Sequence, residues 1–168
     1  MYSRKYLAEF VYGATDGTVT TFAIVAGVAG AALSPSIILI LGFANVFADG
    51  FSMAASDFLS QESDQAVNKR RMFRKTPIQT ALATFVAFAF VGSIPLMPFM
   101  IAFGGTSSID PMRVSVIVTG ITFLVIGAIR GLVAGKHWLR SAIETFIIGA
   151  GASGIAYLVG SFLRGIVG

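Results

Sequence analysis

Five apolar stretches dominate this chain, and each is long enough to cross a lipid bilayer as a helix. They run over Phe10–Leu33, Ile37–Ser60, Pro77–Phe103, Val114–Leu132 and Ala142–Leu163. A spanning helix needs about 20 mainly apolar residues. Charged residues make up only 12% of the chain, roughly half their usual share of a soluble domain. The sequence therefore predicts an all-α membrane protein in which residues 1–168 form one domain of five transmembrane helices.

The segments between these stretches are short, so little chain is left for a soluble domain. Ser34-Pro35-Ser36 predicts a tight antiparallel hairpin of the first two helices, and residues 61–76 are expected to form a short cytoplasmic loop. Two prolines, Pro95 and Pro98, are expected to end or kink the third helix. Small residues at four-residue spacing predict close helix contacts; they are Gly127, Gly131 and Gly135, and Ala150 with Gly154.

The basic residues predict an orientation in the bilayer. With the N-terminus in the cytoplasm, ten of the 12 Lys and Arg residues lie on the inner side, and only Arg113 and Arg164 lie outside. The positive-inside rule then gives a cytoplasmic N-terminus and an external C-terminus. No basic face interleaved with aromatic residues is present, so we expect no nucleic-acid partner. Cys is absent, which excludes disulfides and thiolate metal sites, and Met1–Phe10 has no apolar core typical of a removable signal peptide.

Four acids lie within the predicted spans: Asp16, Asp49, Asp57 and Glu144. A charged group at bilayer depth costs a few kcal/mol, so it usually faces a cavity, a partner or an ion. Asp49, Met53 and Asp57 follow one another at four-residue steps and share one helix face. Measured from the outer turn, Asp16 and Met53 lie at nearly the same depth, roughly 28 and 27 Å along ideal helices. The sequence therefore predicts that Asp16 faces Met53.

This pairing of residue types indicates a metal site. Carboxylates bind many divalent cations, whereas a thioether is a soft ligand that Mg²⁺ and Ca²⁺ do not favour. Asp16, Asp49 and Met53 therefore favour first-row divalent metals, chiefly Fe²⁺. Only an ionised carboxylate binds metal, so metal and protons compete for the same oxygens. We expect a metal that is transported in exchange for protons, and no permanently bound cofactor.

Each candidate also has a structural interpretation. Met53 alone is typical packing filler. Asp16 is a candidate helix N-cap, and Asp57 is a candidate partner for a Lys or Arg of the inner loop. Glu144 lies four residues after Arg140, a spacing that favours a salt bridge. His137 has no second His or Cys with which to bind metal.

Two other classes of function remain as alternatives. An intramembrane hydrolase would use paired aspartates, but neither a His-Glu-x-x-His pair nor a Gly-x-Gly-Asp loop occurs, so we expect no enzyme. A non-transporting membrane partner protein, or a transporter of another solute, would need bases inside the membrane to pair with the acids. Apart from Arg130 near a span end, the spans contain none. A transported cation is thus the favoured counter-charge.

Two motifs in the first hairpin resemble the vacuolar iron transporter family. They are Asp16-Gly17-Thr18-Val19-Thr20-Thr21-Phe22-Ala23, followed by Ala26-Gly27-Val28-Ala29-Gly30-Ala31, and Ala48-Asp49-Gly50-Phe51-Ser52-Met53-Ala54-Ala55-Ser56-Asp57-Phe58-Leu59-Ser60. The resemblance covers nearly the whole chain. It implies a dimer of five-span protomers that exports Fe²⁺, and often Mn²⁺, from the cytosol in exchange for protons. The family's metal-path aspartate and methionine match Asp16 and Met53.

The chain departs from the family pattern in two places. Asn45 stands where the family's best-studied form has a glutamate; it can coordinate metal but cannot carry a proton, and Asp49 is the candidate to replace it. The glutamate-rich cytosolic domain is absent, which leaves Glu62, Asp64, Asp57 and Glu144 as candidate entrance or secondary ligands. Metal capture then falls to these residues or to a cytosolic metal-donor partner. Short loops and the lack of a targeting extension favour a bacterial plasma membrane, with a vacuolar membrane second.

Overall fold

The computed structural model describes residues 6–67, 76–105 and 110–167, and in these ranges all of its regular structure is helical. The elements are α1 (Leu7–Gly30), α2 (Pro35–Val67), α3 (Pro77–Gly92), the 3₁₀ turn η2 (Ile94–Leu96), α4 (Met97–Phe103), α5 (Pro111–Val133) and α6 (Trp138–Val167). The all-α prediction is thereby confirmed. Seven of the basic residues assigned to the inner side lie outside the described residues: Arg4, Lys5, Lys69, Arg70, Arg71, Arg74 and Lys75.

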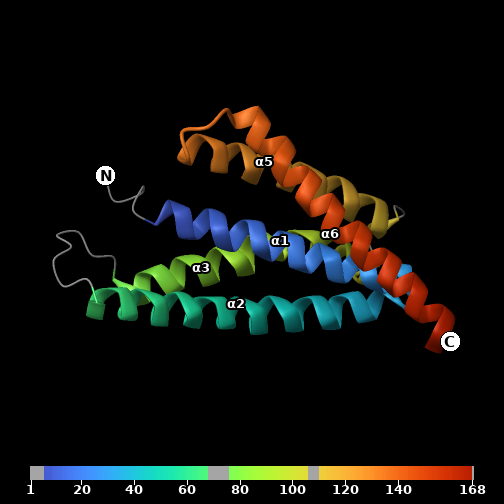
Figure 1. The fold of residues 1–168 in the computed structure, drawn as a ribbon. Helices are drawn as coiled ribbons and strands as arrows, with labels where there is room; N and C mark the ends of the chain where they lie inside the picture. Colours follow the sequence, from blue (N-terminus) through green and yellow to red (C-terminus); the bar gives the residue numbers. More distant parts are fainter. Residues whose placement is uncertain (1–5, 68–75, 106–109, 168) are drawn as a thin grey trace.

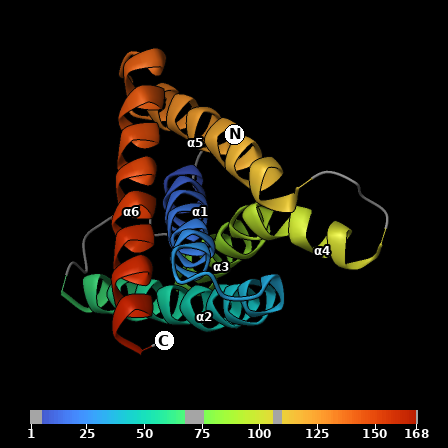
Figure 2. The same ribbon diagram turned by 90° about the vertical axis from the view of Figure 1, so that its right-hand side faces the viewer.

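Helix α1 lies at the centre of the bundle. Figure 1 shows it between the α2–α3 pair on one side and the α5–α6 pair on the other, and the end-on view in Figure 2 shows the other long helices arranged around it. Its most extensive contacts are with α3 and α6 rather than with α2, its hairpin partner. Helix α3 packs against both helices of the predicted hairpin, so α1 and α2 each contact α3 more extensively than they contact each other.

Four helical segments are long and apolar enough to cross a membrane: α2, the α3–α4 segment Pro77–Phe103, α5 and α6. Helix α1 is not among them, because its middle carries several hydroxyl side chains and Asp16 in place of apolar residues. Its surroundings explain how such a composition is tolerated, since neighbouring helices cover much of its length and many of its side chains are buried. A central helix covered in this way does not need a lipid-facing surface.

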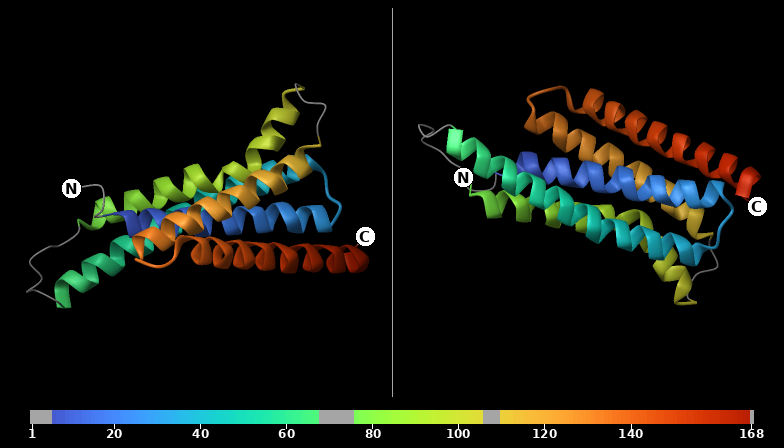
Figure 3. Two further views of the ribbon diagram at one scale, coloured as in Figure 1. Left: turned by 90° about the horizontal axis from the view of Figure 1, so that it is seen from above. Right: turned by 60° about the horizontal axis from the view of Figure 1, so that its bottom comes forward.

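The third span is broken at its prolines, as predicted. Helix α3 ends at Gly92, and Pro95 and Pro98 lie in η2 and α4. Figure 3 shows α4 leaving the axis of α3 at a clear angle. Proline lacks the N–H that would continue the helix ladder, and the buried Ser115 hydroxyl of α5 donates to the Pro95 carbonyl at 2.7 Å.

Helix α2 is longer than predicted. It was expected to end at Ser60, with a loop over residues 61–76, but it continues to Val67. The segment 61–67 contains no Gly or Pro, and the Ser63 hydroxyl donates to the Leu59 carbonyl at 2.8 Å within the helix. The remainder of the predicted loop, 68–75, lies outside the described residues.

The small-residue prediction is correct for Gly127 and Gly131 of α5, and wrong for Gly135 and for α6. A Cβ on Gly127 would lie 2.7 Å from Ala142 Cα, and one on Gly131 would lie 2.9 Å from Ser141 Cβ. Gly135 instead sits in the α5–α6 turn with φ +65. Ala150 is exposed, and a Cβ on Gly154 would meet nothing. The contact face of α6 carries Gly149 and Gly160 instead, because it lies one residue away from the predicted stripe.

The main apolar core occupies the end of the bundle opposite to the start of α1. It is formed by Phe22, Val25, Val28, Ile38, Val46, Leu96, Phe99 and Phe123. Phe22 and Phe123 meet edge to face, with ring centroids 6.4 Å apart. The acidic residues of α1 and α2 lie between this core and the other end of the bundle.

Candidate functional site

The charges are divided between two parts of the bundle. Helices α1, α2 and α3 contain no Lys or Arg, yet α1 and α2 hold six of the eight acids: Glu9, Asp16, Asp49, Asp57, Glu62 and Asp64. The other two acids are paired with arginines. Asp110 lies 3.5 Å from Arg113 and also caps α5 by accepting from the Met112 N–H at 3.0 Å, and Glu144 pairs with arginines of α5 and α6.

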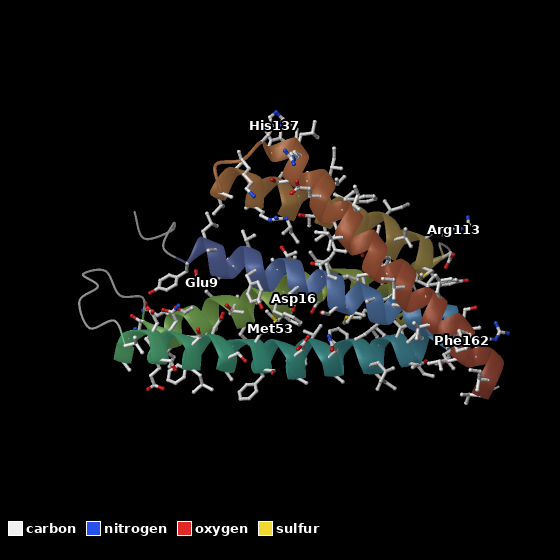
Figure 4. All side chains as sticks on the ribbon, viewed as in Figure 1. Glu9, Asp16, Met53, Arg113, His137 and Phe162 are labelled. Carbon is white, nitrogen blue, oxygen red and sulfur yellow. The ribbon has the colours of Figure 1, made fainter. Side chains whose placement is uncertain are left out.

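Asp16 and Met53 lie at the same level between α1 and α2. In the view of Figure 4 the two labelled residues lie at the same position along the bundle, Asp16 on α1 and Met53 on α2. Both are half-buried, and Asp49 lies near enough to Asp16 for the two charges to interact. The predicted facing of Asp16 and Met53 stays a prediction. The alternative of Asp16 as an N-cap is wrong, because α1 begins at Leu7 and Asp16 lies in its middle.

Phe88 of α3 fixes the relative height of α1 and α2. A Cβ added to Gly17 would lie 3.1 Å from Phe88 Cγ, and one added to Gly50 would lie 3.2 Å from Phe88 Cδ1. One aromatic ring therefore touches both glycines, each of which directly follows a candidate ligand, Asp16 or Asp49. Glycine is required at residue 17 because a Cβ there would overlap the α3 backbone, whereas a Cβ at residue 50 would press tightly on the Phe88 ring.

Asn45 lies two turns before Met53 on the same face of α2. Its amide nitrogen is buried and has no hydrogen-bond partner in the part of the chain that the structure describes. A buried donor of this kind costs about 1–3 kcal/mol when unsatisfied. The Asn45 amide nitrogen, one helical turn from Asp49, is therefore a donor without an acceptor among the described residues.

Asp57 accepts a short hydrogen bond from the Thr84 hydroxyl of α3. Asp57 is half-buried and Thr84 is fully buried. The predicted alternative, an ion pair with a loop Lys or Arg, stays untested because those residues lie outside the described ranges. Sequence reasoning missed Thr84 and with it the contribution of α3. The sequence does contain a pattern that could have predicted this contribution: Thr80 and Thr84 lie one turn apart in a helix that is otherwise apolar except for Gln79.

The remaining candidates lie away from Asp16 and Met53. Glu62 is exposed and Asp64 is half-buried, both in the last turns of α2. Glu144 accepts from Arg140 Nε at 3.1 Å and lies 4.0 Å from Arg130, which confirms the predicted salt bridge. His137 is exposed and stacks on Trp138 with ring centroids 6.3 Å apart.

The acids of one protomer do not form a complete metal site by themselves. Within the ranges 6–67, 76–105 and 110–167, no group of three or more His, Asp or Glu side chains is placed to hold a metal ion. A metal site at Asp16 and Asp49 therefore requires the Met53 thioether, the Asn45 carbonyl oxygen, or ligands from outside this chain.

The fold and the placement of these residues define an all-helical integral membrane protein with acidic side chains inside its bundle. A family model described as the VIT family matches residues 7–76 and 66–161, and the chain belongs to this family. The resemblance seen in the sequence is thereby confirmed.

Several curated proteins are similar along their length. A vacuolar iron transporter of Toxoplasma gondii is 29% identical over 232 residues, covering 99% of this chain and 77% of that protein. Vacuolar iron transporter 1 of Arabidopsis thaliana is 25% identical, covering 95% and 87%. Vacuolar iron transporter homolog 4 of Arabidopsis thaliana is 30% identical over 179 residues, covering 95% and 88%.

Proposed function

We propose that this protein is a divalent-metal exporter that moves Fe²⁺, and also Mn²⁺, out of the cytosol in exchange for protons. The observation that carries the proposal is the placement of Asp16 and Asp49 near Met53 in a three-helix unit without Lys or Arg. Acids inside a membrane protein need a counter-charge, and these helices supply none. The names of the relatives, vacuolar iron transporters, support iron as the metal.

The ligand set supports a first-row metal. Asp16 and Asp49 supply carboxylate oxygens, Asn45 a carbonyl oxygen and Met53 a soft sulfur, a mixture that Mg²⁺ and Ca²⁺ do not favour. Only an ionised carboxylate binds metal, so protons compete with metal for the oxygens of Asp16 and Asp49. Metal and protons thus occupy the same oxygens in turn, which is the requirement for exchange.

The proposed topology rests on the helices and on the distribution of the basic residues. We infer five spans, with α1 as the fifth, covered by its neighbours. The N-terminus lies in the cytoplasm and the C-terminus outside, because most Lys and Arg residues then lie on the inner side. Export in this orientation proceeds from the acidic end of α2 toward the α1–α2 turn. The bacterial plasma membrane is the proposed location, with a vacuolar membrane second.

A homodimer would complete the site. One protomer offers two carboxylates, one thioether and one amide near Asp16, and the described residues hold no group of three acids or histidines. Octahedral metals take about six ligands, so a second copy that presents the same face would supply the rest. Dimer formation is testable by the mass of the detergent-solubilised protein.

The segment between the second and third spans is short in this chain, and this affects how metal reaches the transport path. The family model matches in two stretches that meet at residues 66–76. The Toxoplasma alignment also needs 232 positions to cover a 168-residue chain, so that relative carries additional residues inside the matched region. We propose that the cytosolic metal-binding domain is missing here, and that Glu62, Asp64 or a metal-donor partner delivers metal.

Reconstitution into lipid vesicles tests the proposed function. Entry of Fe²⁺, Mn²⁺ and Zn²⁺ is followed with an internal metal-sensitive dye, beside internal pH. We expect metal entry coupled to proton exit in the wild type, and none in Asp16→Asn. Asp110→Asn, which changes a capping acid at the start of α5, is the matched control and should transport normally. Metal flux that survives Asp16→Asn would refute the site, and metal flux without proton movement would refute exchange.

A further inference from the structure

The Thr84 hydroxyl of α3 donates to a side chain of another helix. Five other threonines in the described helices donate to the carbonyl four residues earlier in the chain: Thr15, Thr18, Thr20, Thr80 and Thr122. This is the common arrangement for a helical threonine. Thr84 instead donates to the Asp57 carboxylate of α2. The hydroxyl therefore acts between helices rather than within one.

The position of Thr84 is fixed by close backbone packing. A Cβ on Gly13 would lie 2.5 Å from the Thr84 carbonyl oxygen, and one on Gly17, a turn later, would lie 2.8 Å from the Phe88 carbonyl oxygen. At the same end of the bundle, the Tyr6 hydroxyl of the segment before α1 donates to Gln79 Oε1 at 2.6 Å. Helix α3 thus cannot shift along α1 without overlap, and Thr84 is held in place.

The surroundings of Asp57 are acidic and contain no basic side chain from these helices. Helix α3 carries no ionisable residue, α1 contributes Glu9 and Asp16, and the rest of α2 contributes Asp49, Glu62 and Asp64. A carboxylate has about four acceptor sites on two oxygens. One hydroxyl therefore orients the Asp57 carboxylate and leaves most of its acceptor sites available to a cation.

Asp57 lies between Met53 and the C-terminal end of α2. It follows Met53 by one helical turn, about 6 Å along α2, on the side toward the helix end. Asn45, Asp49, Met53 and Asp57 share one face, and Gln61 and Asp64 continue it. All six are half-buried, whereas most of their neighbours on α2 are exposed. A cation that enters from the end of α2 meets Asp57 before it meets Met53 and Asp16.

We propose that Thr84 is a positioning residue for the transport path: it holds the Asp57 carboxylate so that Asp57 receives the divalent cation before Asp16 and Met53. This inference rests on the proposed function and adds a loading step to it. Asp57 in this role raises the local concentration of cation at the entrance. Its loss affects the metal concentration needed for transport rather than the maximal rate.

Initial rates of Mn²⁺ uptake into vesicles, measured over a range of Mn²⁺ concentrations, test the proposal. In Asp57→Asn the hydrogen bond is retained through the amide oxygen but the charge is lost, and in Thr84→Val the shape is retained but the hydroxyl is lost. We expect the half-saturating concentration to rise about tenfold in each, in line with the loss of groups that orient metal ligands, with maximal rates within about twofold. Thr84→Ser should restore wild-type values.

The controls separate positioning from a purely structural role. Thr80→Val removes a hydroxyl that bonds only within α3 and should leave the half-saturating concentration unchanged. The double variant Asp57→Asn with Thr84→Val should resemble Asp57→Asn alone, because the hydroxyl acts through the carboxylate. If Thr84→Val does not fold, Asp57→Asn tests the loading role of Asp57, and Thr84→Ala, which also lacks the hydroxyl, tests the role of Thr84.

The two proposals fail differently. A wild type that moves no metal refutes the proposed function. A wild type that moves Mn²⁺ while Asp57→Asn has an unchanged half-saturating concentration refutes only the loading role of Asp57. A Thr84→Ser variant as impaired as Thr84→Val would show that packing, rather than the hydroxyl, matters, and would overturn the assignment of Thr84.

Discussion

Gly17 of α1 lies directly against Phe88 of α3, so that a Cβ on Gly17 would come within 2.8 Å of the Phe88 carbonyl oxygen and 3.1 Å of the ring. The Phe88 side chain is fully buried and also contacts Gly50 of α2. This contact joins the three helices at the level of Asp16 and Asp49. The candidate site therefore depends on a packing arrangement that only a glycine at residue 17 allows.

Gly17→Ala is expected to destabilise the protein by about 1–3 kcal/mol, the usual cost of overpacking, because the obstacle is backbone. Gly165→Ala, at a position in α6 where a Cβ would meet nothing, should be neutral or slightly stabilising, since alanine favours helix by up to about 1 kcal/mol. Thermal unfolding of the detergent-solubilised variants measures both. Equal stability of the two variants would contradict the described α1–α3 contact.

Ser115→Ala tests the kink in the third span. The buried Ser115 hydroxyl donates to the Pro95 carbonyl at 2.7 Å, and its loss leaves that carbonyl without this donor, at a cost of about 1–3 kcal/mol. Ser153→Ala is the matched control, because the Ser153 hydroxyl donates to a carbonyl of its own helix. We expect a clear loss of unfolding free energy in Ser115→Ala and a change below about 0.5 kcal/mol in Ser153→Ala. The reverse order would argue against the cross-helix bond.

The salt bridge of Glu144 should contribute little. Its arginine partner Arg140 is 83% exposed, and exposed ion pairs are worth about 0.2–1 kcal/mol. Glu144→Gln is expected to lower stability within that range, by less at high salt, and to leave metal transport unchanged. Arg140→Gln should have a similar effect on stability. A loss of transport in Glu144→Gln, comparable to that of Asp16→Asn, would instead place Glu144 on the metal path.

Much of the fold followed from the sequence, because hydrophobic length and proline positions act locally. The helical spans and the break at Pro95 were predicted for that reason. The end of α2 was misplaced because polarity was taken as a sign of a loop, although the segment 61–67 contains no helix breaker. The Thr84–Asp57 bond was missed because it joins residues 27 positions apart, and only the packing of α3 against both α1 and α2 brings them together.

Met53→Leu tests whether sulfur contributes to metal choice. Leucine has nearly the same volume, so stability should change by less than about 1.5 kcal/mol. Loss of the soft ligand should reduce Fe²⁺ transport more than Mn²⁺ transport, because Mn²⁺ relies more on oxygen ligands. Competition between the two metals in vesicle uptake measures the ratio. Met100→Leu, at an exposed position of α4, is the control, and an identical ratio in both variants would remove Met53 from the ligand set.

Asn45→Glu tests how protons are coupled to metal. The Asn45 amide nitrogen is buried without a partner among the described residues, and a glutamate there removes that donor and adds a carboxylate one turn from Asp49. The added carboxylate is a further group that binds either metal or a proton, because only its ionised form binds metal. We expect more protons to be exchanged per metal ion in Asn45→Glu, measured as the ratio of internal pH change to metal entry. Asn45→Gln keeps a neutral amide and should not alter the ratio. An unchanged ratio in Asn45→Glu, in a variant that still transports metal, would mean that residue 45 takes no part in proton exchange and that Asp16 and Asp49 carry it alone.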